Sequence, residues 1–326
     1  MRYLSVFLLI MVLLNFVPAQ NAFARNIDMK PIDDFICFMN LAESARPETR
    51  YLLWHKHYFE PNADTLQKIV FKTSDEIKIK KSMFKALDNI FNNYRLHHEM
   101  LVEFKRNFQF LLSESVNKFK IYFPDANFDD IQFYVLAGNQ SFNARADMID
   151  GKPAFELSAE MFEDIKGIEI TLMHELFHLH HMKRFEKAGN KIEERLYFPL
   201  IFEGCAVYFS KISAGGSIED CMRMGLPDYL KLFDGAGFTK KCEKFSAKSA
   251  KLLYDKINKP VAAETFLKLF GSKIDNGGEP ARIGYYLGYK VIESAAAEIT
   301  LNKIVDLKKK DIISLCKRHL EKLIER

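Results

Sequence analysis

The residues best suited to chemistry lie in the segment 174–178, which reads His-Glu-Leu-Phe-His. If this segment is helical, His174 and His178 are one turn apart on one face, so both imidazoles can bind the same metal ion. Glu175 stands beside them, where its carboxylate can accept a proton from a water molecule that the metal activates. The flanking residues are apolar on nearly every side, which is typical of a buried active-site helix. The spacing therefore predicts a catalytic site for one Zn²⁺ ion per chain.

A catalytic zinc ion needs a third protein ligand and one open position for water. One class of zinc enzymes takes the third ligand from a histidine six residues after the second, but Arg184 occupies that place here. The other common source is a glutamate on a following helix. Glu203 fits this role, because Pro199 is placed to begin a helix and Gly204 allows that helix to approach the active-site helix closely. We expect Glu203 to be the third ligand; the alternative is a surface glutamate at a helix start.

The motif at 174–178, together with the segment Glu203-Gly-Cys-Ala, resembles the pattern of the gluzincin metallopeptidases. That group includes thermolysin-like enzymes, large zinc aminopeptidases and uncharacterised bacterial zinc-dependent peptidases. The resemblance covers about residues 130–300. It implies a zincin-like fold, in which the edge strand of a small sheet lines the cleft above the two ligand helices. It also implies hydrolysis of a peptide or protein substrate, with Glu175 as the general base.

Two departures from the gluzincin pattern bear on the activity. Val207 stands where thermolysin-like enzymes keep an aspartate that supports a zinc histidine, and the Gly-x-Met-Glu-Asn element of the aminopeptidases is absent. The second departure favours an endopeptidase over an aminopeptidase. A different class of function is a non-catalytic binding protein that keeps the zincin fold. Glu175 argues against it, because a structural zinc site needs no base and usually has four protein ligands.

A further group of hydrogen-bond donors lies near residue 285. In peptide hydrolysis, negative charge develops on the carbonyl oxygen, and a tyrosine or arginine donor placed over the cleft stabilises it. On a helix, Tyr285 and Tyr289 share one face, while Tyr286 projects about 100° from Tyr285. We expect Tyr286, and next Tyr285, to be the donor, with Arg282 as a partner of the oxyanion or of a substrate carboxylate. The alternative is that the segment only packs, since Gly288 allows close contact with another helix.

The elements that must position these residues are mostly helical. Apolar residues recur at helical spacing through residues 25–120, which predicts an N-terminal helical region. After Pro124 the segments 131–136, 144–149 and 152–157 favour strands, with Asp150-Gly151 as the turn of a hairpin. Helical spacing returns at residue 158 and continues to a basic amphipathic C-terminal segment. The predicted fold class is α+β and mostly α, with a zincin-like region over 121–326.

The N-terminal residues indicate export. A basic start, a short apolar run and a small-x-small ending at Ala24 predict a signal peptide over residues 1–24, with an uncleaved anchor as the alternative. We therefore expect a periplasmic or secreted protein without stable membrane association after cleavage. The net charge of +4 is too small to indicate a nucleic-acid partner. In an oxidising compartment Cys221 and Cys242 could form a disulfide; the alternative is buried thiols.

Overall fold

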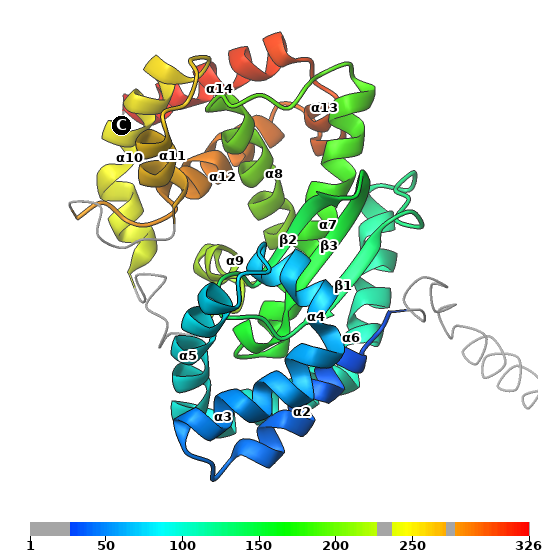
Figure 1. Cartoon of the computed structure of the whole chain (residues 1–326). Coiled ribbons are helices and arrows are strands. Elements are labelled where there is room, and N and C mark those ends of the chain that lie inside the picture. Colours follow the sequence, from blue (N-terminus) through cyan, green and yellow to red (C-terminus); the bar gives the residue numbers. More distant parts are fainter. Residues whose placement is uncertain (1–26, 227–236, 272–277, 326) are drawn as a thin grey trace, which may run out of the picture.

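The computed structural model describes residues 27–226, 237–271 and 278–325. The predicted signal peptide, residues 1–24, lies outside the described residues. In Figure 1 the N-terminal helices lie at one end of the molecule and the C-terminal helices at the other, with the sheet and helix α7 between them. The fold is α+β and mostly helical with one small sheet, as the hydrophobic periodicity predicted.

The N-terminal half is built from helical elements. They are α2 (Lys30–Ala42), α3 (Pro47–Trp54), η2 (His55–Phe59), η3 (Glu60–Asn62), α4 (Ala63–Thr65), η4 (Leu66–Phe71), α5 (Glu76–Asn92) and α6 (Tyr94–Tyr122). Tyr58 attaches this part to the sheet: its hydroxyl accepts a hydrogen bond from the N–H of Ala137 at 2.9 Å and donates one to the carbonyl of the same residue at 2.5 Å. A fully buried tyrosine thus satisfies both backbone groups just beyond the end of strand β1.

The sheet has three strands, β1 (Gln132–Leu136), β2 (Ala144–Ile149) and β3 (Lys152–Ser158), in the order β1-β3-β2. Strands β2 and β3 are antiparallel, and β1 runs parallel to β3. The hairpin turn lies where the sequence predicted it, because Asp150 and Gly151 both have positive φ, 51° and 74°. Strand β2 is therefore an edge strand of this sheet, and one of its sides is open for other contacts.

Two neighbouring helices carry the chemical motif. Helix α7 spans Ile165–Lys187. At its start, the side chain of Asp164 accepts a hydrogen bond from the backbone N–H of Gly167 at 2.6 Å. It ends before Gly189, which has a positive φ of 80°. Helix α8 (Tyr197–Ala214) packs extensively on α7. The predicted ligand Glu203 lies in its second turn.

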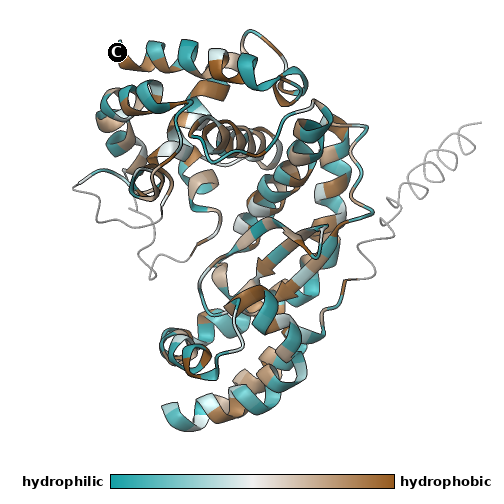
Figure 2. Ribbon diagram, turned by 45° about the horizontal axis from the view of Figure 1, so that its top comes forward, coloured by the Kyte–Doolittle hydropathy of each residue, from teal (hydrophilic) through white to brown (hydrophobic). Residues whose placement is uncertain are grey.

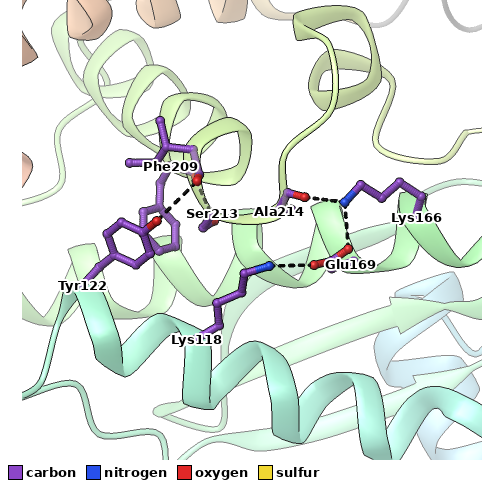
Figure 3. A network of polar contacts seen from close by, with 8 residues as sticks. Lys118, Tyr122, Lys166, Glu169, Phe209, Ser213 and Ala214 are labelled. Atoms are coloured by element: carbon purple, nitrogen blue, oxygen red, sulfur yellow. Dashed lines mark hydrogen bonds and ion pairs between the residues drawn. The ribbon is translucent and has the colours of Figure 1, made fainter.

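A polar network ties these two helices to α6, as Figure 3 shows. Lys118 of α6 donates to Glu169 of α7 at 3.0 Å, and Lys166 of α7 donates both to Glu169 at 2.8 Å and to the carbonyl of Ala214. Tyr122 of α6 also donates to a carbonyl near the end of α8. A lysine that binds the last carbonyls of a helix complements the negative end of its dipole. The network therefore fixes how α7 and α8 lie against each other.

The remaining elements among the described residues are η5 (Ala159–Met161), α9 (Ile218–Arg223), α10 (Phe238–Lys256), α11 (Ala263–Phe270), α12 (Ile283–Ala296), α13 (Leu301–Val305) and α14 (Lys309–Ile324). Figure 2 shows hydrophilic and hydrophobic residues mixed along the outer helices, as expected for surface helices. The basic C-terminal segment is such a helix: α14 buries one stripe, with Leu315 and Leu320 in it. Among the described helices, none has the length and apolar character needed to cross a membrane.

The predicted bridge between Cys221 and Cys242 is not formed. All five cysteines carry thiols, and both members of this pair are buried. Burial is the main cause that raises the pKa of the Cys221 thiol to about 11. The alternative of buried, reduced cysteines therefore describes these positions.

Candidate metal centre

The three predicted ligands meet at one point. The Nε2 atoms of His174 and His178 lie 3.0 Å apart. The Oε2 atom of Glu203 lies 3.2 Å from the first and 3.3 Å from the second. Helix α7 supplies both imidazoles because the residues are one turn apart, and α8 supplies the carboxylate. The side chain of His174 is only 2% exposed and that of Glu203 is 22% exposed, so the site opens to solvent on the glutamate side.

This donor set fits a zinc ion. Ligand atoms at about 2.0–2.1 Å from a tetrahedral ion stand about 3.3–3.4 Å from one another, close to the three separations here. Two imidazoles and a carboxylate are also ligands that zinc favours, and three protein ligands leave one position for water or substrate. Across the described residues, this is the one group of three or more candidate ligands that can share an ion.

The electrostatics of the three residues favour a cation between them. Burial alone disfavours a charged His178, but the carboxylates of Glu203 and Glu175 outweigh it and raise the pKa of His178. Burial likewise opposes ionisation of Glu203, yet the charges of His178 and His174 and their hydrogen bonds hold the pKa of that carboxyl well below its usual range. Glu203 is therefore an ionised carboxylate in a partly buried place, where a positive partner stabilises it.

Glu175 is held by the edge strand. Its Oε2 atom accepts a hydrogen bond from the backbone N–H of Ala146 in β2 at 2.9 Å, and its side chain is buried. This hydrogen bond fixes one carboxylate oxygen of Glu175 in place. The sequence predicted a strand at 144–149. It contained no signal that Ala146 would contact Glu175, because that contact depends on how the sheet lies over α7.

Tyr285, rather than Tyr286, lies at the ligand cluster. Burial, followed by the negative charges of Glu203 and Glu175, raises the pKa of Tyr285 well above its usual value, while Arg282 acts in the opposite direction. The hydroxyl therefore stays protonated and can donate a hydrogen bond. Arg282 lies over this ring, with its guanidinium 5.5 Å from the ring centroid, and donates to the carbonyl of Met222 at 3.3 Å.

The sequence favoured Tyr286 over Tyr285 as the donor, and of the two it is Tyr285 that lies near the carboxylates of Glu203 and Glu175. Neighbouring residues on a helix project about 100° apart, and Tyr286 is buried, with 3% of its surface exposed. Tyr289 lies one turn farther along α12. Its hydroxyl accepts from Lys211 at 3.0 Å and donates to Glu293, which places it in a separate polar group.

Gly204 has a different neighbour from the one predicted. A Cβ atom at this position would lie 2.4 Å from the backbone carbon of Gly288, so the glycine allows close contact with α12 rather than with α7. Gly284 faces the ring of Phe270. Helix α12 is thereby held against α8, and this contact carries Tyr285 to the site.

The two histidines that follow the motif are buried among aromatic rings, and neither is a surface residue. His181 stacks on Phe202 at 4.1 Å with an interplanar angle of 9°, and His180 lies 4.6 Å from the ring of Phe123. Burial is the main cause that lowers the pKa of His180 to about 4. Both are neutral packing residues at physiological pH, and sequence spacing alone could not show that rings cover them.

Comparison of the chain with protein-family models, with curated proteins and with solved structures found no match.

Proposed function

We propose that this protein is an exported, zinc-dependent metallopeptidase of gluzincin type that hydrolyses peptide bonds in peptide or protein substrates. The observation that carries the proposal is the triangle of His174 Nε2, His178 Nε2 and Glu203 Oε2, with Glu175 next to it and with separations that match a tetrahedral zinc ion. A bound zinc ion would supply Lewis acidity, activating water at neutral pH and polarising a carbonyl group.

The chain's own residues account for the remaining roles. Glu175, oriented by the N–H of Ala146, takes a proton from the attacking water and passes it to the leaving amine. Tyr285 keeps its proton and donates a hydrogen bond to the carbonyl oxygen as negative charge develops there. Arg282 lies against the ring of Tyr285 and so acts as a positioning residue for it.

The open side of strand β2 supports a peptide as the substrate. Ala146 points its N–H toward Glu175 and also lines the cavity beside His178 and Glu203. An extended peptide can pair with an edge strand through main-chain hydrogen bonds, here with groups of β2 other than the N–H of Ala146, and this pairing would place its carbonyl groups near the site. This arrangement is also what a zincin-like fold would have. The position of Glu175 beside three candidate metal ligands favours catalysis over a non-catalytic binding role, because a purely structural metal site has no use for a base.

The proposal is tested by zinc analysis of the purified chain and by peptide hydrolysis with and without the carboxylate of Glu175. Zinc binding without hydrolysis of any peptide would favour the binding protein instead.

A further inference from the structure

A cavity of about 870 Å³ opens directly beside the candidate ligands. His178, Glu203 and Ala146 of the edge strand line it. The volume lies in the range of about 300–1,000 Å³ that is usual for ligand pockets. A substrate whose carbonyl lies at the metal centre would therefore place a neighbouring side chain in this cavity.

The wall of the cavity is largely apolar. Phe198 and Phe202 of α8 lie with ring centroids 4.1 Å apart, and Phe202 stacks in turn on the buried His181. Met182 and Val261 add further apolar surface. Because Phe202 is held between two rings, the inner wall is a fixed surface that suits an apolar group.

The outer rim is also apolar, although water reaches it. Ile192, Phe266 and Leu267 are 56%, 39% and 61% exposed, and all three line this one cavity from two separate parts of the chain. Large apolar side chains that gather around a cavity on a protein surface mark a binding site. An apolar ligand group would remove them from water.

Charged groups at the rim are mostly compensated. The carboxylate of Glu193 is bound by Lys309 at 2.7 Å and by Arg195 at 2.7 Å. Glu194 is exposed at the mouth, where water solvates it. Apart from the candidate metal ligands His178 and Glu203 and the rim residues 193–195, the described residues that line the cavity are apolar.

We propose that this cavity is the specificity pocket of the peptidase and that it takes a large apolar side chain, the size of leucine or phenylalanine, of an extended peptide next to the cleaved bond. The inference rests on the proposed function. It assigns a specificity-determining role to residues outside the motif, chiefly Phe198, Phe202, Phe266 and Leu267.

The test uses short synthetic peptides of one common sequence in which a single Ala, Leu, Phe, Asp or Lys is moved across the central positions. Products are sequenced by mass spectrometry, so the varied residue can be placed relative to the cleaved bond. At one fixed position, kcat/KM for Leu or Phe should exceed that for Ala by about 10- to 200-fold, the range that an apolar pocket provides. Equal rates for Phe, Ala and Asp at every position would overturn the proposal.

Two neighbouring alanines give a matched pair of variants. Ala263 lines the cavity, whereas Ala262 precedes it and does not, and both are exposed, so substitution leaves the core intact. Ala263→Trp fills the cavity and should lower the Phe-to-Ala ratio of kcat/KM at least tenfold. Ala262→Trp should keep the ratio of the parent. If the Phe-to-Ala ratio of kcat/KM is similar in both variants, the preference for an apolar side chain comes from another surface.

A binding experiment separates the two proposals. Fluorescence anisotropy of dye-labelled peptides with Glu175→Gln measures affinity without turnover. If no peptide is hydrolysed by the parent but Phe peptides bind more tightly than Ala peptides, and Ala263→Trp removes the difference, the pocket is supported and the peptidase function fails. If peptides are hydrolysed without any apolar preference in rate or affinity, the pocket fails and the function stands.

Discussion

Gly204 of α8 and Gly288 of α12 touch backbone to backbone. A Cβ atom on Gly204 would lie 2.4 Å from the carbonyl carbon of Gly288, and one on Gly288 would lie 2.5 Å from the carbonyl oxygen of Leu200. Glu203 directly precedes the first glycine, and Tyr285 lies three residues before the second. The contact therefore sets the separation between the third candidate ligand and the candidate oxyanion donor.

The first prediction concerns this helix contact. Gly288→Ala should destabilise the protein by about 1–3 kcal/mol, because a methyl group cannot fit between two backbones and the helices must move apart. The gain in helix propensity, about 1 kcal/mol, offsets part of this cost. Chemical unfolding measures the change. The double variant Gly204→Ala/Gly288→Ala should lose less free energy of unfolding than the sum of the two single variants, since both changes act at one contact. Strictly additive losses would argue against this contact.

Tyr285 is expected to stabilise the developing charge. Tyr285→Phe should lower kcat by about 10²- to 10³-fold, the usual cost of losing one such donor, with little change in zinc content or melting temperature. Tyr289→Phe on the same helix face is the control, because its hydroxyl belongs to a separate group with Lys211 and Glu293. Steady-state kinetics on one cleaved peptide compares them. Full turnover by Tyr285→Phe would show that the donor lies elsewhere.

Glu203 is the candidate ligand that lies outside the His-Glu-x-x-His motif. Glu203→Ala should lower the zinc content of the purified chain well below one ion, because two imidazoles leave the site short of the three protein ligands that a catalytic zinc normally has. Glu194→Ala, at the mouth of the same cavity, should keep its zinc. Elemental analysis after dialysis measures the zinc content of both variants. Undiminished zinc in Glu203→Ala would mean that the third ligand is another residue.

Glu160 should make stability depend on pH. Burial raises its pKa from 4.5 to about 7, although the N–H groups of Gly138 and Gln140 and the Ser158 hydroxyl favour the carboxylate. Between these two values the folded chain binds more protons than the unfolded chain, so the free energy of unfolding falls as pH rises through that window. The loss from this group is of the order of 3 kcal/mol at most.

The variant Glu160→Gln removes the titration at this position. It should lower stability overall, because an amide nitrogen faces N–H donors, but its free energy of unfolding should fall less between pH 5 and pH 8 than that of the parent. Glu264→Gln, at an exposed position, should leave the parent's pH dependence unchanged. Urea unfolding at each pH gives the free energy of unfolding. If this free energy changes with pH in the same way for the parent and for Glu160→Gln, Glu160 is not the source of the pH dependence.

Local chemistry explains what could be predicted from the sequence. His174 and His178 are one helical turn apart, so their convergence follows from helix geometry alone. The hairpin follows from Asp150-Gly151, because that dipeptide tolerates the positive φ that the turn requires. The proximity of Glu203 was a weaker prediction, since it depends on how α8 returns along α7, and the structure brings it to the expected point.

Contacts between distant segments explain what could not be predicted. Whether Tyr285 or Tyr286 faces the ligands depends on the rotation of α12, which Gly288 and Gly284 fix against α8 and α11. The burial of His181 depends on Phe202, which another helix supplies. The contact of Ala146 with Glu175 depends on the position of the sheet over α7. Neither periodicity nor motif spacing carries this information.

The most direct measurement is the rate of peptide hydrolysis by the zinc-loaded parent chain and by zinc-loaded Glu175→Gln, side by side. The amide has nearly the size of the carboxylate but cannot accept a proton, so the variant should keep its zinc and its melting temperature. We expect the parent to cleave peptides and the variant to be slower by about 10²- to 10⁴-fold, the usual contribution of a general base. Equal rates in the two proteins at equal zinc content would contradict the account.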